Sequence, residues 1–79
     1  MSAAGSYRLI VTRGGRAPSL LADAERVDHV EVVEIDSGEV VLFWDRSPRA
    51  ATKLARALRE DLVRLGAEEF MARWSTLES

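Results

Sequence analysis

The sequence predicts an α+β fold in which a three-stranded antiparallel sheet is followed by a long and a short helix that pack on one of its faces. Three observations lead to this prediction. Strand-like segments precede residue 45, a turn-forming stretch joins the last two of them, and a regular apolar stripe follows residue 47. A chain of 79 residues supports one domain, which we place at residues 7–79 after a flexible N-terminus at residues 1–6.

The first strand is predicted at residues 7–13, where the side chains alternate between two faces. One face carries Tyr7, Leu9 and Val11, and the other carries Arg8, Ile10 and Thr12. Gly14-Gly15 ends this strand. Residues 14–26 form a predicted connecting loop, with a short helical turn after Pro18-Ser19 as an alternative.

The next two strands, residues 27–35 and 40–44, form a predicted antiparallel hairpin around the turn at residues 36–39. The segment 40–44 is apolar on both faces, which predicts a strand that is central in its sheet or covered on both sides. In its partner, Val30 and Val32 favour one face while Val33 and Ile35 favour the other. This pattern predicts a bulge, or a sheet with apolar patches on both sides.

A long helix is predicted from residue 48 to residue 65, with Ser47 as its N-cap and Pro48 at its first position. Its apolar stripe consists of Ala51, Leu54, Ala55, Leu58, Leu62 and Leu65. Gly66 is expected to end it as a C′ glycine in the left-handed conformation. A short helix follows over residues 67–77, with Phe70 and Trp74 turned inward.

A single layer of helices covers only one face of such a sheet, so the opposite apolar face needs a partner. A second copy of the chain is the simplest partner, and we expect a homodimer or another protein in contact with this face. The candidate interface residues are Val33, Ile35, Val41, Phe43, Trp44 and Trp74. The two tryptophans are also candidates for the core.

Charge is segregated along a chain whose net charge is −2. Residues 23–45 contain eight acidic residues and one basic residue, a net charge of −7, whereas residues 46–64 contain six basic and two acidic residues, a net charge of +4. The favoured interpretation of the basic outer face of helix 48–65 is a solvated surface with internal ion pairs around Glu60. The alternative is a surface that binds nucleic acid or another anion. The residues in question are Arg13, Arg16, Arg46, Arg49, Lys53, Arg56 and Arg59.

The stretch VLFWDRSPRA, residues 41–50, changes from an apolar strand to a basic helix start. The favoured interpretation is that Ser47 caps the helix. The alternatives are a small anion site formed by Arg46, Arg49 and the helix start, or phosphorylation of Ser47. His29 is the only histidine and is interpreted as a half-exposed strand residue, because metal and general-base sites need more convergent ligands.

The residues predict no catalytic centre and no cofactor. The chain contains no cysteine, and it lacks a phosphate-binding loop and a dinucleotide fingerprint. Since no apolar run is long enough to span a membrane, we expect a cytoplasmic protein. The leading hypothesis is a small non-catalytic interaction or regulatory module that self-associates through its sheet. The alternative is a nucleic-acid-binding regulator that uses the basic face of helix 48–65.

Overall fold

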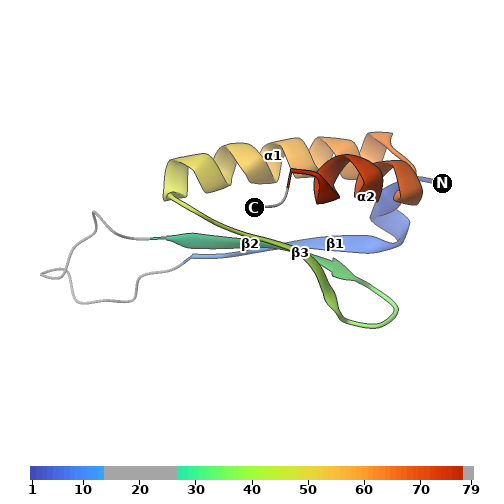
Figure 1. The fold of residues 1–79 in the computed structure, drawn as a ribbon, viewed down its shortest axis with the longest axis horizontal. Coiled ribbons are helices and arrows are strands. Elements are labelled where there is room, and N and C mark those ends of the chain that lie inside the picture. The colour runs from blue at the N-terminus through green and yellow to red at the C-terminus, as the bar shows by residue number, and fades with distance from the viewer. Residues whose placement is uncertain (14–26, 78–79) are drawn as a thin grey trace, which may run out of the picture.

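The computed structural model describes residues 1–13 and 27–77, and these residues confirm the predicted fold class. The described elements are η1 (Ala3–Gly5), β1 (Tyr7–Thr12), β2 (Asp28–Glu34), β3 (Val40–Arg46), α1 (Pro48–Arg64) and α2 (Ala67–Ser75). The strands form a three-stranded antiparallel sheet, and both helices lie on the same side of it (Figure 1). The loop predicted at residues 14–26, with its alternative helical turn, lies outside the described residues.

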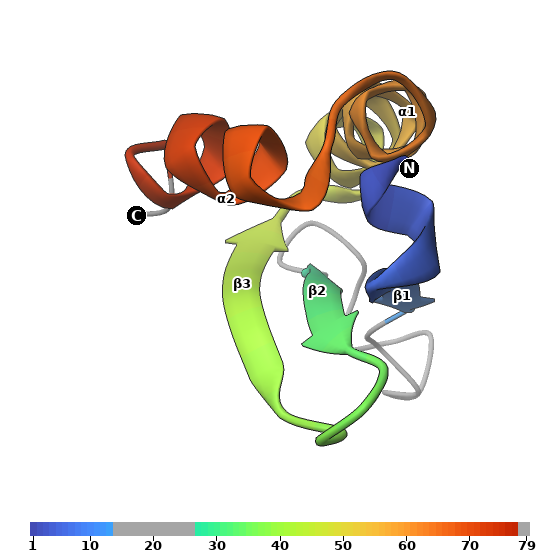
Figure 2. The same ribbon diagram turned by 90° about the vertical axis from the view of Figure 1, so that its right-hand side faces the viewer.

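The strand order is β1-β2-β3, which makes β2 the central strand and β3 an edge strand. The prediction that segment 40–44 is the central strand is therefore wrong, and the helices of the chain cover it on one side only (Figure 2). The two apolar faces of this strand have different environments. Leu42 and Trp44 enter the core, with 1% of each side chain exposed, while Val40 and Phe43 point to the uncovered side. Hydropathy alone does not distinguish this arrangement from a strand buried on both faces.

The predicted turn joins β2 to β3, and Gly38 provides its one left-handed backbone position, with φ +76°. The N–H of Gly38 donates to the carbonyl of Glu34 at 2.8 Å, and the N–H of Glu34 donates to the carbonyl of Glu39 at 2.8 Å. The hydroxyl of Ser37 donates to Oε1 of Glu34 at 2.6 Å. Glycine adopts a positive φ without steric cost, so Gly38 allows the chain to turn here. The hydrogen bonds then hold the turn and set the register of the hairpin.

A bulge interrupts this register, as the apolar pattern predicts. Val32 pairs with Leu42, but the next residue, Val33, pairs with Val40. The extra residue is therefore Val41 of β3, and its half-buried side chain packs against the core. Val33 and Val40 consequently share the face that points away from the helices.

The core lies between the sheet and the two helices. Val30, Val32, Leu42 and Trp44 form its sheet side, and each has at most 1% of its surface exposed. Its helix side is formed by Ala51, Ala55, Leu58, Leu62, Phe70 and Trp74. Viewed along the strands, α1 lies above β1 and β2 while α2 lies on the side of β3 (Figure 2). The leucine stripe of the sequence is therefore the buried face of α1.

The two ends of α1 differ in how well the sequence predicts them. Ser47 is the N-cap, and its hydroxyl accepts from the N–H of Ala50 at 3.4 Å, as expected. Gly66 does not end α1 in the left-handed conformation. Its φ is −75°, and it is the N-cap of α2, where its N–H donates to Oε1 of Glu69 at 3.4 Å. Leu65 ends α1 in an extended conformation, so the chain passes from one helix to the next without a left-handed turn.

A buried carboxylate attaches α2 to α1. Asp61 is 7% exposed. Its Oδ2 accepts a hydrogen bond of 2.9 Å from the indole N–H of Trp74 and forms an ion pair with Arg73, with 3.3 Å between Oδ2 and Nε. The ring of Trp74 meets that of Trp44 edge-on at 6.0 Å. These contacts hold α2 against β3 and satisfy the polar atoms that the packing buries.

The N-terminus differs from the frayed segment expected at residues 1–6. Ala3 is fully buried in the core, and its N–H donates to the carbonyl of Leu65 at 2.7 Å. The small side chains of MSAAGS, which lack an apolar pattern, are what allow η1 to fit beneath the end of α1. The carbonyl of Leu65 at that helix end thereby gains a backbone donor.

Candidate interaction surfaces

The uncovered side of the sheet is one candidate surface, and we call it the open face. The strand register places on it Arg8, Ile10, Thr12, His29, Glu31, Val33, Val40, Phe43 and Asp45. The helices lie on the opposite side (Figure 2). Side chains on this face therefore meet solvent in the single chain.

The apolar side chains of the open face gather toward the β2–β3 turn. Ile10 and Phe43 are each 38% exposed, Val40 is 49% exposed, and Ile35 in the turn is 44% exposed. A hollow of about 340 Å³ lies beside them, lined by Arg8, Ile10, Val33, Glu34, Ile35 and Gly38. Such a cluster of exposed apolar residues on one face is typical of interaction sites.

Two opposite charges lie within this apolar region. Glu31 lies between Ile10 and Phe43 in the cross-strand register, and its side chain is half-buried. Arg8 pairs with Val33 in the same register. Among residues 1–13 and 27–77, neither Arg8 nor Glu31 forms an ion pair.

The other end of the open face is polar. His29 and Asp45 are cross-strand partners, and Nδ1 of His29 forms a hydrogen bond with Oδ1 of Asp45. The imidazole also stacks on the ring of Phe43 at 5.6 Å. Within the part of the chain that the structure describes, histidine, aspartate and glutamate side chains form no group of three that would hold a metal ion. His29 therefore occupies a half-buried strand position, as the sequence predicts.

The residues predicted for an interface divide into two groups. Val33, Ile35 and Phe43 lie on the open face or at its border. Trp44 and Trp74 lie in the core, at 1% and 6% exposure, and Val41 packs against the core at the bulge. Burial leaves the two tryptophans without surface to offer a partner, because they supply the large apolar volume that a domain of this size needs.

The residues predicted to contact an anion also separate. Arg49, Lys53 and Arg56 line one hollow on α1, and Arg13 and Arg59 line a second, between the end of β1 and α1. Arg46 lines neither hollow; it lies in β3, where its Nη1 donates to the carbonyl of Asp45 at 2.7 Å. Arg16 lies outside the described residues. The predicted ion pairs around Glu60 are absent from the described residues.

The structure adds residues to the open face that sequence patterns did not single out as interface candidates. Arg8, Ile10 and Val40 belong to it because β1 pairs with β2 and because the bulge turns Val40 outward. Alternation along residues 7–13 identifies Arg8 and Ile10 as members of one face. Which of the two faces the helices cover depends on packing between elements distant in sequence.

Comparisons of the chain with protein families, curated proteins and solved structures find no match. Neither helix in the described part of the chain has the length and apolar content needed to cross a membrane. Inference about function therefore depends on the open face and on the two hollows lined by cationic residues beside α1.

Proposed function

We propose that this protein is a small non-catalytic interaction module that self-associates through the open face of its sheet. One observation carries the proposal: the chain covers one face of the sheet with its own helices and leaves Ile10, Val40 and Phe43 at least 38% exposed on the other. Removing apolar surface from water stabilises an assembly by about 25 cal/mol per Å². A second copy can supply that cover.

A face-to-face arrangement of two sheets fits the shape of this surface. Two sheets pack about 10 Å apart with their inner side chains interdigitated, as in β-sandwiches. A two-fold axis then brings the same patch of both copies together. Both helices lie on the opposite side of the sheet (Figure 1), so they would lie on the outer sides of such a dimer.

The two charges of the open face favour a second copy as the partner. A carboxylate buried without a partner is costly, and Glu31 stands among the apolar residues that the interface buries. In an isologous dimer, any contact from Arg8 of one copy to Glu31 of the other occurs twice. The face is therefore complementary to itself in charge as well as in apolar character.

Sedimentation velocity across the micromolar range tests the proposal directly. We expect a concentration-dependent shift from monomer to dimer, and we expect Phe43→Glu to raise the dissociation constant at least about tenfold, equivalent to about 1.4 kcal/mol. Val63→Glu is the matched control, because Val63 is an exposed apolar residue of α1, at 70%, on the other side of the molecule. A protein that stays monomeric throughout, or equal weakening by both variants, would overturn the proposal.

A charge exchange tests the isologous geometry. Arg8→Glu and Glu31→Arg each place like charges together across a two-fold interface, so each variant alone is expected to lose dimer. Mixing the two variants restores opposite charges at both contacts, and the mixture is expected to form heterodimers. Failure of the mixture to associate, with both variants folded by circular dichroism, would contradict this pairing.

A further inference from the structure

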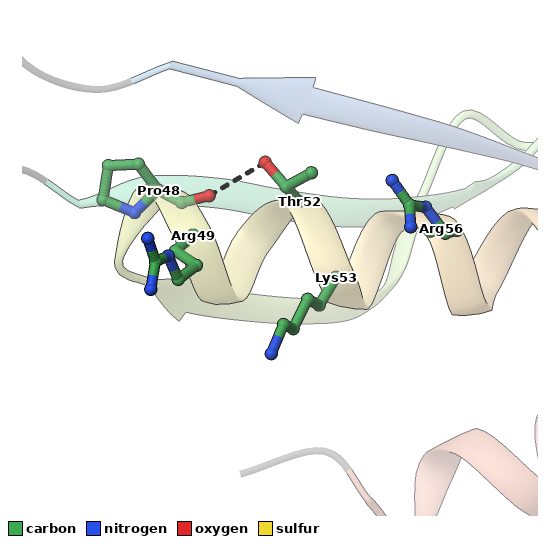
Figure 3. A pocket seen from close by; sticks show the side chains of 5 residues that line it. All are labelled: Pro48, Arg49, Thr52, Lys53 and Arg56. Carbon is green, nitrogen blue, oxygen red and sulfur yellow. Dashed lines mark hydrogen bonds between the residues drawn. The ribbon is translucent and has the colours of Figure 1, made fainter.

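The proposed function leaves the basic side of α1 unexplained. Two neighbouring hollows there share Thr52. One, of about 530 Å³, is lined by Pro48, Arg49, Thr52, Lys53 and Arg56 (Figure 3). The other, of about 280 Å³, is lined by Val11, Arg13, Thr52, Ala55 and Arg59. We call their five cationic residues the basic surface; they are Arg13, Arg49, Lys53, Arg56 and Arg59.

In the part of the chain that the structure describes, the basic surface has no acidic counterpart. Its five side chains are exposed. Among residues 1–13 and 27–77, no acidic residue lines either hollow and none of the five cations forms an ion pair. The two acids of α1 do not neutralise it. Asp61 is buried against Trp74 and Arg73, and Glu60 is exposed but lines neither hollow.

This arrangement lowers the stability of α1 unless an anion offsets it. Arg49 and Lys53 are four residues apart, and Lys53, Arg56 and Arg59 follow at intervals of three. Like charges at these spacings are neighbours on a helix and repel each other. A bound polyanion offsets these repulsions, because each cation is then attracted to a nearby negative charge.

The cations form an extended array instead of converging on one point. Arg49 and Arg59 are ten residues apart on α1, so their backbone positions are about 15 Å apart at 1.5 Å per residue. Arg13, which follows β1, adds a cation beside Arg59 from a distant part of the sequence. A single phosphate does not span this length. One strand of a nucleic-acid duplex presents a phosphate about every 3.4 Å along its axis and places about four beside it.

The chemistry of the lining favours a duplex over an unpaired strand. Single-stranded nucleic acid is held largely by bases that stack on aromatic rings. The described residues that line the two hollows include no aromatic side chain. The hydroxyl of Thr52 donates to the carbonyl of Pro48 at 2.9 Å, which leaves the cations as the main contacts (Figure 3).

We propose that the basic surface binds the phosphate backbone of double-stranded nucleic acid, without reading its sequence. Contacts to phosphates position a protein on a duplex but carry no base information. Four of its five residues belong to α1, which lies on the side of the sheet opposite the open face (Figure 1). Binding therefore does not require self-association, and the two proposals fail or succeed separately.

Fluorescence anisotropy with labelled DNA and RNA duplexes of mixed sequence tests this proposal. At low salt we expect binding of at least one duplex, and we expect the logarithm of the affinity to fall linearly with the logarithm of salt concentration. With three to five phosphates contacted, the slope is about −3 to −4.5. Lys53→Gln and Arg56→Gln are each expected to make this slope shallower by about 1.

Arg64→Gln is the matched control, because it removes the same charge from α1 outside both hollows. Circular dichroism verifies that every variant remains folded. No duplex binding at low salt would overturn the proposal, as would tighter binding to a single-stranded oligonucleotide or to phosphatidylserine vesicles. An effect of Arg64→Gln equal to that of Lys53→Gln would also overturn it, since attraction would then follow net charge and not this surface.

Discussion

The two faces of the sheet are built from the same kinds of residue but have opposite environments. On the covered face, Val30 and Trp44 are at most 1% exposed. On the open face, Phe43 is 38% exposed although it is the chain neighbour of Trp44. The difference arises because α1 and α2 both pack on the same side of the sheet and leave the other side uncovered (Figure 2). Apolar side chains in a strand therefore indicate a face that favours burial, but they do not indicate which element or partner buries it.

The two faces also differ in how they treat charge. On the helix side, the carboxylate of Asp61 is buried and has two donors within 3.3 Å. On the open face, Glu31 and Arg8 have no ion-pair partner within the described residues. The core thus satisfies its buried carboxylate internally, whereas the described residues of the open face leave these two charges without an opposite charge. The comparison leads to four predictions, given from the largest expected effect to the smallest.

Substitution of the neighbouring residues Phe43 and Trp44 compares most directly how much each face contributes to the free energy of unfolding. Trp44→Ala is expected to lower the free energy of unfolding by about 3–5 kcal/mol, because it removes a fully buried ring and leaves a cavity. Phe43→Ala is expected to cost about 1–2 kcal/mol in the monomer. Urea unfolding followed by far-UV circular dichroism, at dilutions that keep the protein monomeric, measures both. Equal losses would show that the open face is part of the folding core.

Removal of the buried carboxylate separates hydrogen bonding from charge on the helix side. Asp61→Ala leaves the indole N–H of Trp74 buried without an acceptor and is expected to cost about 1–3 kcal/mol. Asp61→Asn keeps an acceptor and loses only the ion pair with Arg73, whose side chain is 61% exposed, so its cost should stay below about 1 kcal/mol. Thermal unfolding compares the two. A loss from Asn as large as that from Ala would assign the effect to charge.

The hairpin turn controls which residues reach which face, and Gly38 tests that control. Gly38→Ala is expected to cost about 1–2 kcal/mol, because its positive φ is unfavourable for an L-residue. No heavy atom lies within 4 Å of the added Cβ, so the effect is conformational and not steric. Gly38→Asn should recover part of the loss, since asparagine tolerates this region better. Chemical unfolding measures both, and an equal loss from Asn would point to another cause.

The hydrogen bond between His29 and Asp45 on the open face should have the smallest effect. The side chains of His29 and Asp45 are 43% and 56% exposed, so His29→Gln and Asp45→Asn are each expected to cost less than about 1 kcal/mol. A double-mutant cycle by urea unfolding isolates the pair from the stacking of His29 on Phe43. A coupling energy as large as the loss for Asp61→Ala would place this corner among the structural contacts of the covered side.

Local patterns in the sequence were sufficient for most of the fold. Residues 36–39 identify the hairpin turn, Ser47 and Pro48 identify the start of α1, and the leucine stripe identifies its buried face. Each of these features is identified from residues that lie only a few positions apart in the sequence. The end of α1 was predicted less well, because a glycine after a helix serves equally as a C′ residue or as the N-cap of the next helix. Gly66 takes the second role.

The candidate surfaces depended more on tertiary structure. The sequence identified Val33 and Phe43 as members of one face and the cations of α1 as one row. It left Trp44 and Trp74 as candidates for either the core or an interface, and it did not indicate that Arg13 lies beside Arg59.

By itself, therefore, the sequence determined where the strands, turn and helices begin and that the apolar surface exceeds what two helices cover. Only the tertiary structure decided that β2 is central, that Ala3 closes the core beneath α1, and which face of the sheet is open. The physical reason is that periodicity records which side chains share a face, whereas burial depends on contacts between residues far apart in the chain.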